Sequence, residues 1–338
     1  MVRLLLVCLC LGQFSFLPAA AAEAETAADT SNVTFRIALL ATGSITDGGW
    51  NQLAKDGLTV DVEGMNVQLT VLQKVAQDRA AGHMQQLAAK GIPLIIAHGY
   101  EYLNPASEVA AHAPNTRIVV CGADVARPNI ITIDFDVSGA SYQAGVLAAR
   151  VSTKKTFGYI GGAQIPSVKA CYRGFLAGVR SVLPQATVSE TYTSWDQPQQ
   201  NKAQAEALLR QGIDVIYHNV DAASSGIFEA IAAANAQGGP GSAWVIGCVA
   251  DQNDRPLVKD AILGSAVIRL DATFASIIKD VQAGTSKPGL VVENLARGTC
   301  VFVPNPRLLK TTITPEMCAE LDAVGAKIIA GTVKIPTE

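Results

Sequence analysis

Short apolar runs alternate with longer amphipathic stretches along most of the chain. Runs such as FRIALLA at 35–41 and IPLIIAH at 92–98 are continuously apolar, as strands buried on both faces of a sheet are. The stretches between them repeat apolar residues at helical spacing. This alternation predicts an α/β fold with a parallel sheet covered by helices on both faces. We expect strands at 35–41, 67–73, 92–98, 116–122 and 129–135, and helices at 49–63, 77–90, 104–112 and 137–152.

The same alternation begins again at TFGYIGGA, residues 156–163, which has the pattern of another first strand. A helix at 272–284 and a strand at 290–294 are expected to return to the first half, before a final helix at 315–330. No Gly/Ser-rich or Pro-rich linker separates the halves, so several strands should pass between them as a hinge. The other expected elements are strands at 187–193, 213–219, 243–249 and 265–270, and helices at 166–183, 198–211 and 222–236. We predict two Rossmann-like lobes, the first 33–152 with about 272–300, the second 153–271 with about 301–338.

The N-terminal residues 1–22 have the pattern of a secretory signal peptide. Arg3 precedes an apolar stretch, and small residues with A-x-A spacing follow around Ala20 to Ala22. A membrane anchor is the alternative, but the apolar stretch is short and leads into the small and acidic residues EAETAADTSN. We therefore predict that the segment is cleaved and that the protein is exported to the periplasm, either free or associated with the membrane.

Composition and motifs exclude several classes of function. Charged residues make up 16% of the 338-residue chain, the formal net charge is −3 and no Lys/Arg run occurs, so we expect no nucleic-acid partner. The cysteines beyond the signal peptide lack C-x-x-C spacing, which excludes zinc and thioredoxin-type sites, while a Cys300–Cys318 disulfide stays open. The sequence has no G-x-S-x-G, P-loop, H-E-x-x-H or G-x-G-x-x-G motif. We expect no cofactor, no metal and no enzymatic activity.

Ligands of open parallel sheets bind beyond the carboxyl ends of the strands. Two of the 3 tryptophans fall in such segments, Trp50 in the first half and Trp195 in the second, and each has a polar neighbour. If these strand ends face one another, a flat ring between the indoles would gain about 1–3 kcal/mol per stacked face. Asn and Asp side chains could then recognise its polar edge. The candidate ligand-binding residues in these segments are Thr42, Asp47, Trp50, Asn51, His98, Tyr100, Trp195, Asp196, Asn219, Asp221 and Asp251.

Several of these residues also have a purely structural interpretation. An aromatic side chain in the first turn of a helix, such as that of Trp50, can pack against the preceding strand as a hydrophobic staple. Asp47 is a good N-cap for the same helix, and capping does not exclude a contact with ligand. His98 could be a strand-end residue whose hydrogen bonds are satisfied within the protein, and Tyr100 could lie at a wet domain edge.

Several segments match motifs of one known family. The segment GYIGGAQIPSVKACYRGFLAGVRSV has the form G-x-I-G-G-x-x-I-P-x-V followed by G-F-x-A-G. ITDGGWNQLAKDGL is similar to Asp-x-x-Phe-Asn with Trp in place of Phe, and TSWDQP is similar to G-S-[FW]-x-D-P. Beyond the signal peptide, nearly all of the chain resembles the basic membrane protein (BMP) family of ABC-transporter substrate-binding proteins, the purine-nucleoside receptors. The resemblance implies a type I periplasmic-binding-protein fold, a nucleoside or nucleobase between the lobes, and docking on an ABC transporter permease.

The resemblance also implies roles for individual residues. Asp47, Trp50 and Asn51 would contact the base, and Trp195 would stack on its other face. In the segment GCVADQ, Asp251 matches the last Asp of the family motif G-V-D-x-D-Q.

The chain departs from the family where ribose would be bound. Val249 replaces the first Asp of that motif, and Arg269 stands in place of a Lys. Losing an acceptor for the sugar diol while keeping the aromatic residues favours a free purine base, or a related flat heterocycle, over a nucleoside. Asn219 or Asp221 could instead supply the missing acceptor.

Two other functions are compatible with the sequence. A type I receptor for a sugar or an amino acid is one, because paired tryptophans with Asp and Arg also form sugar sites. An exported nucleoside hydrolase is the other and is less favoured, although catalytic triads need not be local in sequence. A co-purified purine would add ultraviolet absorbance to a receptor, whereas a hydrolase would release product. We expect the protein to be a monomer.

Overall fold

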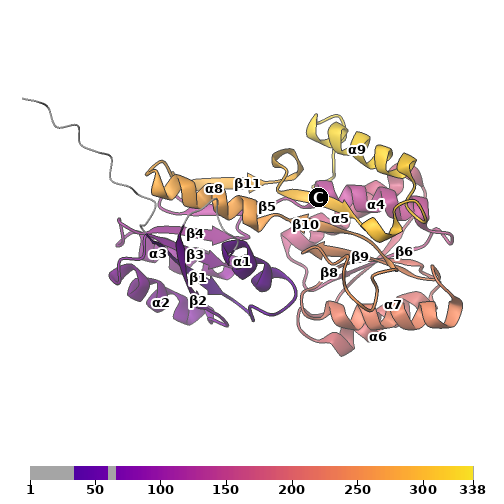
Figure 1. The fold of residues 1–338 in the computed structure, drawn as a ribbon, viewed down its shortest axis with the longest axis horizontal. Helices are drawn as coiled ribbons and strands as arrows, with labels where there is room; N and C mark the ends of the chain where they lie inside the picture. Colours follow the sequence, from indigo (N-terminus) through magenta and orange to yellow (C-terminus); the bar gives the residue numbers. More distant parts are fainter. Residues whose placement is uncertain (1–33, 60–65, 338) are drawn as a thin grey trace, which may run out of the picture. The chain divides into compact units, whose positions relative to one another are not determined.

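The computed structural model describes residues 34–59 and 66–337, and the predicted signal peptide over residues 1–22 lies outside them. Within the described residues the chain forms two 6-stranded sheets, one in each lobe (Figure 1). The strand order is β11-β5-β4-β3-β1-β2 in the first sheet and β12-β10-β9-β8-β6-β7 in the second. The two orders correspond position by position, which confirms the predicted α/β fold with two similar lobes.

The first lobe is built on a parallel sheet with helices on both faces. Side chains of β1 alternate between two cores, with Ile37 and Leu39 in one and Ala38 and Leu40 in the other. This alternation explains why the strand is apolar at every position. The strands of this lobe are β1 (Phe35–Ala41), β2 (Val67–Leu72), β3 (Leu94–His98), β4 (Arg117–Cys121), β5 (Ile131–Phe135) and β11 (Gly289–Glu293). Its helices are α1 (Trp50–Thr59), α2 (Gln77–Ala89), α3 (Leu103–Ala110) and α8 (Leu270–Gln282).

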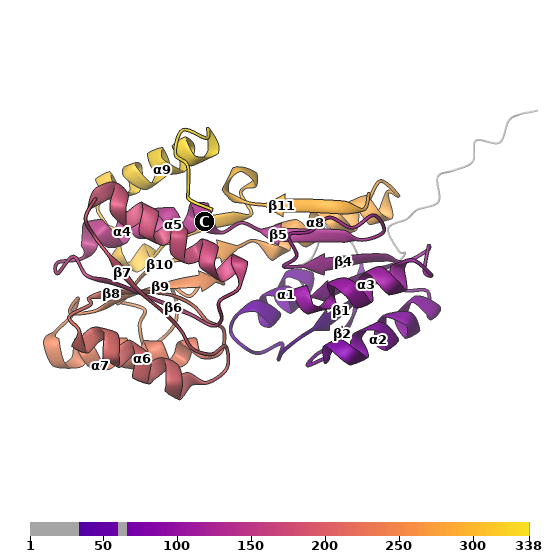
Figure 2. The same ribbon diagram turned by 180° about the vertical axis from the view of Figure 1, so that it is seen from behind.

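The second lobe repeats this plan, with α6 and α7 on one face of its sheet and α4 and α5 on the other (Figure 2). Its strands are β6 (Phe157–Gly161), β7 (Val188–Tyr192), β8 (Val215–Asn219), β9 (Trp244–Val249), β10 (Ile262–Ile268) and β12 (Cys300–Pro304). Its helices are α4 (Ser138–Val151), α5 (Pro166–Val182), α6 (Pro198–Arg210), α7 (Ser224–Gly238) and α9 (Pro315–Ile329). The sequence pattern did not predict β12, an edge strand that pairs antiparallel with β10.

The chain passes between the two sheets after β5, after β10 and after β11. The first passage follows β5, which ends at Phe135, whereas the lobe boundary was expected at residue 152. Helix α4 lies between these two positions and packs against α5, β10 and β12 of the second lobe. Glycines make this packing close: a Cβ at Gly145 would lie 2.2 Å from the Phe175 carbonyl oxygen, and one at Gly178 would lie 2.0 Å from that of Tyr142. Helix α4 therefore belongs by packing with the lobe that follows it.

The described cysteines are all free thiols, so the disulfide considered between Cys300 and Cys318 is not formed. Cys121, Cys171, Cys248 and Cys300 are buried, which the apolar runs IVVCGAD and WVIGCVA predict for Cys121 and Cys248. None of the helices within residues 34–59 and 66–337 combines the length and the hydropathy that a membrane span requires. The same residues contain no cluster of side chains suited to a metal ion.

Candidate functional site

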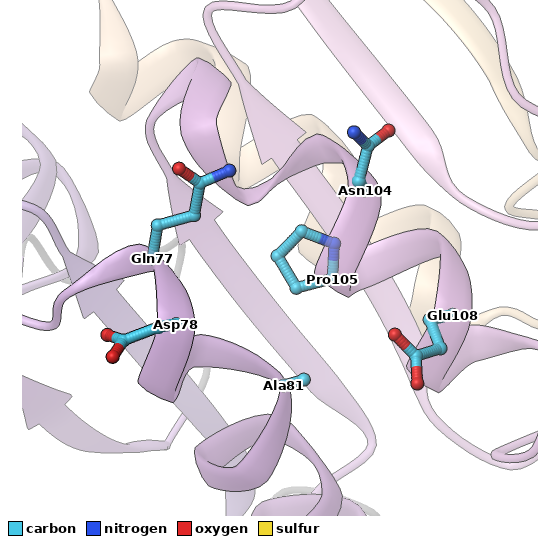
Figure 3. A pocket seen from close by; sticks show the side chains of 6 residues that line it. All are labelled: Gln77, Asp78, Ala81, Asn104, Pro105 and Glu108. Atoms are coloured by element: carbon cyan, nitrogen blue, oxygen red, sulfur yellow. The ribbon is translucent and has the colours of Figure 1, made fainter.

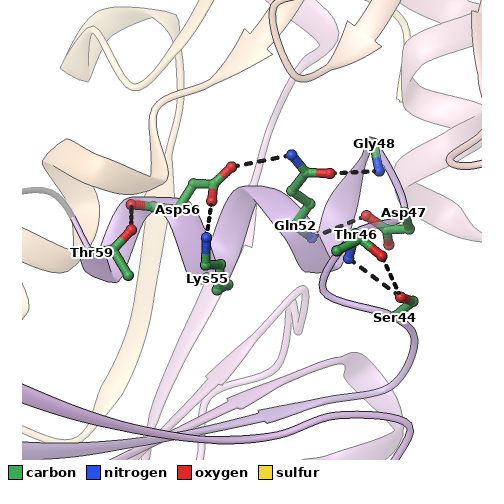
Figure 4. Close-up of polar contacts among 8 residues, drawn as sticks. All are labelled: Ser44, Thr46, Asp47, Gly48, Gln52, Lys55, Asp56 and Thr59. Atoms are coloured by element: carbon green, nitrogen blue, oxygen red, sulfur yellow. Dashed lines mark hydrogen bonds and ion pairs between the residues drawn. The ribbon is translucent and has the colours of Figure 1, made fainter.

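The loop between β1 and α1 is organised by one carboxylate. Asp47 Oδ1 accepts hydrogen bonds from the backbone N–H groups of Gly49 (2.9 Å) and Gln52 (3.0 Å). Asp47 Oδ2 accepts from the N–H of Asn51 (3.1 Å) and from its Nδ2 (2.9 Å). Gln52 in turn accepts the Gly48 N–H at 3.0 Å (Figure 4). The capping role predicted for Asp47 is confirmed, because its oxygens bind N–H groups that a helix start leaves without partners.

Asn51 is buried and joins the end of β1 to the start of α1. Its Oδ1 accepts the hydroxyl of Thr42 and the N–H of Gly43, both at 3.2 Å, while its Nδ2 donates to Asp47. The polar atoms of the Asn51 side chain are thus engaged inside the first lobe. Thr42 and Asn51, both predicted site residues, fix the position of the loop that carries Trp50.

Trp50 is held by aromatic contacts within its own lobe. Its ring stacks on His98 with centroids 3.8 Å apart and planes 22° from parallel, and it meets Phe135 edge-on at 5.7 Å. His98 Nε2 donates to the Trp50 carbonyl oxygen at 3.0 Å, and burial lowers the pKa of His98 to about 3, so the ring is neutral. His98 therefore covers one face of the indole and acts as its support.

Two hydrogen bonds join this loop to the second lobe. The backbone N–H of Trp50 donates to Asp221 Oδ1 at 3.0 Å, and Arg255 Nη2 donates to the Gly48 carbonyl oxygen at 2.9 Å. Both contacts depend on glycine: a Cβ at Gly49 would lie 2.4 Å from Asp221 Oδ1, and one at Gly48 would lie 3.0 Å from Arg255 Nη2. Arg255 was not predicted from the sequence, where the only signal for such a contact is the adjacent glycine pair.

Trp195 lies at the carboxyl edge of the second sheet. Its ring covers Gly162, since a Cβ at that glycine would lie 2.2 Å from Trp195 Cε3. The Gly162 N–H donates to the Asn219 carbonyl oxygen at 3.0 Å, which fixes the ends of β6 and β8 side by side. The Asn219 side chain donates to Cys171 Sγ at 3.3 Å and so turns into the lobe.

The remaining predicted site residues take no part in these contacts. Tyr100 is 57% exposed, and Asp196 and Asp251 are exposed and each accept a hydrogen bond within their own loop. Arg269 donates twice to the Asp271 carboxylate, at 3.1 and 2.9 Å. Arg269 is therefore already paired with an anion at the start of α8.

The two indoles do not touch. Among the residues that the structure describes, Trp50 and Trp195 make no ring contact with each other, and both are partly buried against the same hydrophobic cluster. Their convergence on one ligand stays a prediction.

Val249 has an unusual backbone at the end of β9. Its φ is 72°. The other described residues with positive φ are glycines and lysines, so Val249 is the β-branched residue among them. A left-handed conformation costs a β-branched residue about 1–3 kcal/mol, and such strain clusters at functional sites. The backbone at 249 thus suits Asp or Asn, which adopt positive φ more readily, better than it suits Val.

Among the hollows on the described surface, two differ in how they relate to the predicted site. One, of about 380 Å³, adjoins the contact between the lobes and is lined by Asp47, Gly48, Phe228 and Arg255 among others. The other, of about 610 Å³, lies between α2 and α3 in the first lobe (Figure 3) and contains none of the predicted site residues. The first hollow is therefore the one connected to the predicted site.

Two linked α/β lobes, with polar and aromatic loops at the strand ends, define the type I periplasmic-binding-protein fold. A solute-binding protein of an ABC transporter from Aeropyrum pernix has the same fold, with a TM-score of 0.78 and 21% identity over 90% of this chain and 94% of that one. The chain belongs to the Bmp family of PnrA-like ABC transporter substrate-binding proteins, whose family model matches residues 34–338.

Relatives of the chain have diverged widely in sequence. A CD4+ T-cell-stimulating antigen of Listeria innocua is 25% identical over 91% of this chain and 90% of its own length. A purine-binding protein of Brucella abortus is 29% identical over 53% of this chain and 52% of its own length. The family is one of substrate-binding proteins that serve ABC transporters.

Proposed function

We propose that this protein is the exported receptor of an ABC importer and captures a purine base or nucleoside between its lobes, with the free base favoured. The observation that carries the proposal is the placement of Trp50 at the contact between the lobes, stacked on one face by His98. Trp195 at the end of the other sheet supplies a second indole. The name of the Brucella abortus relative, a purine-binding protein, supports the ligand class.

The preference for a free base rests on Val249 and Arg269. Val249 offers no acceptor for a ribose diol, and Arg269 is paired with Asp271. A buried hydroxyl that loses its partner costs about 1–3 kcal/mol, so a nucleoside would bind less tightly than its base. Ligand would then shift an open–closed equilibrium of the lobes, and the closed protein, a monomer in the periplasm, would dock on its permease.

Equilibrium dialysis of the purified chain tests this function. Adenine, guanine and xanthine are expected to bind at least about tenfold more tightly than adenosine and guanosine, which corresponds to about 1.4 kcal/mol. Tighter binding of nucleosides would refute the preference for a free base. Binding of glucose or an amino acid, with no binding of any purine, would refute the ligand class.

The substitution Val249→Asp is expected to restore nucleoside binding. An Asp carboxylate at this position supplies an acceptor for a sugar diol, and Asp adopts positive φ more readily than Val. We expect the ratio of nucleoside to base affinity to rise about tenfold in the same dialysis assay. Val249→Gly is the matched control, because Gly adopts the same left-handed backbone without supplying an acceptor. An equal change in both variants would assign the effect to backbone strain instead.

A further inference from the structure

We propose that Asp221, Arg255, Gly48 and Gly49 form an interlobe latch, which holds the two lobes closed before ligand enters. Asp221 and Arg255 lie in loops at the ends of β8 and β9, whereas the glycines precede α1 in the first lobe. The hydrogen bonds from Trp50 N–H to Asp221 and from Arg255 to the Gly48 carbonyl oxygen are the bonds of the latch. The latch itself does not depend on which ligand the protein binds.

The N–H groups at the start of α1 identify the role of Asp221. The N–H groups of Gly49, Asn51 and Gln52 donate to Asp47, and that of Leu53 donates to the Gly49 carbonyl oxygen. In the part of the chain that the structure describes, only Asp221 accepts the N–H of Trp50. Helix α1 is therefore fully capped only when the other lobe is in place, and a carboxylate is the favoured group at such a helix start.

The glycine pair allows the second lobe to approach the backbone. A Cβ at Gly49 would overlap the Asp221 Oδ1, Cβ and Cα atoms at 2.4, 2.9 and 3.0 Å. Because the Cα atom cannot rotate away, any other residue at position 49 would force the lobes apart. Gly48 has a left-handed backbone with φ 69°, a conformation that glycine adopts without strain. In this conformation its carbonyl oxygen accepts the hydrogen bond from Arg255.

A repulsion between two carboxylates weakens the latch. The negative charge of Asp47 lies near Asp221 and repels it, so closure combines two hydrogen bonds with one unfavourable pairing of charges. A ligand must enter while the lobes are apart, so the population held closed without ligand lowers the apparent affinity and the association rate. This last consequence rests on the proposed function, whereas the latch can be tested on the ligand-free protein.

Hydrogen exchange of the Trp50 amide in the ligand-free chain, measured by NMR at one fixed pH, tests the latch. Asp221→Ala and Gly49→Ala are expected to raise its exchange rate at least about tenfold. Arg255→Met removes the other bond and leaves Asp221 intact. It should raise the same rate at least about threefold, because both bonds break when the lobes part. The radius of gyration from X-ray scattering should increase in all of these variants.

Matched controls separate the latch from local effects. Gly82→Ala is the control for Gly49→Ala, since a Cβ at Gly82 in α2 meets nothing within 4 Å. Asp254→Asn is the charge control, because Asp254 is exposed and pairs with Arg307 in its own lobe. Neither control should change the Trp50 exchange rate. If Arg255→Met leaves that rate and the radius of gyration unchanged, Asp221 is a local cap and the latch is refuted.

Discussion

Replacement of both indoles, Trp50→Ala with Trp195→Ala, is expected to lower the affinity for a purine by about thirty-fold to about twenty-thousand-fold. Stacking of a base on one aromatic face is worth about 1–3 kcal/mol by alanine substitution. Because the two indoles make no contact with each other, their contributions should add, and each 1.4 kcal/mol is a tenfold change in affinity. Isothermal titration calorimetry with the base that the wild-type protein binds most tightly measures the loss.

Aromatic replacements provide the control for this experiment. Phe at positions 50 and 195 keeps a stacking face, so the double Phe variant should bind within about tenfold of the wild-type protein. Tyr100→Ala removes an exposed aromatic side chain that does not line the hollow beside Asp47 and should change the affinity by less than about threefold. If the double Ala variant is folded by circular dichroism and still binds within twofold of wild type, the indoles do not hold the ligand.

Apolar strands could be predicted well because burial on both faces leaves no polar position inside them. The run at 35–41 was predicted and β1 spans Phe35–Ala41 with its last residues all buried. Strand β12 was missed because only part of its surface is buried and because an antiparallel edge strand interrupts the strand–helix alternation. The packing of α4 with the second lobe was also missed, since a helix with apolar and small residues around its circumference does not indicate which sheet it covers.

The loops that carry the candidate site residues could be located from the strand ends, but the direction of each side chain could not be predicted. Asn219 ends β8 as expected, yet its amide donates to Cys171 Sγ on α5, because alternation along the strand places Asn219 on the same face as Val215 and Tyr217. Arg255 was missed because a single Arg in a loop forms no pattern with its neighbours. Its partner is a backbone carbonyl of the other lobe, which the sequence cannot bring next to it.

Asp221 also makes the contact between the lobes sensitive to pH. Burial, and then the negative charge of Asp47, raises the pKa of Asp221 from 3.8 to about 7, while the hydrogen bond from Trp50 opposes this rise. His98, which stacks on Trp50 beside this contact, stays neutral between about pH 5 and pH 8, because burial lowers its pKa to about 3. Closure of the lobes should therefore take up a proton on Asp221.

The closed form of the ligand-free protein is expected to lose stability relative to the open form as the pH rises. A carboxyl whose pKa is raised by closure favours the closed form fully below about pH 4, and this preference is lost as the pH passes about 7. Between about pH 4 and pH 7, each pH unit reduces the free energy that favours the closed form by up to about 1.4 kcal/mol. This corresponds to a tenfold fall in the ratio of closed to open molecules. X-ray scattering should show a radius of gyration that increases from about pH 5 to about pH 8. Burial also raises the pKa of Asp134 in the first lobe, so Asp221→Asn is the necessary control. A wild-type profile without pH dependence, or an Asp221→Asn profile that follows the wild-type one, would contradict this role of Asp221.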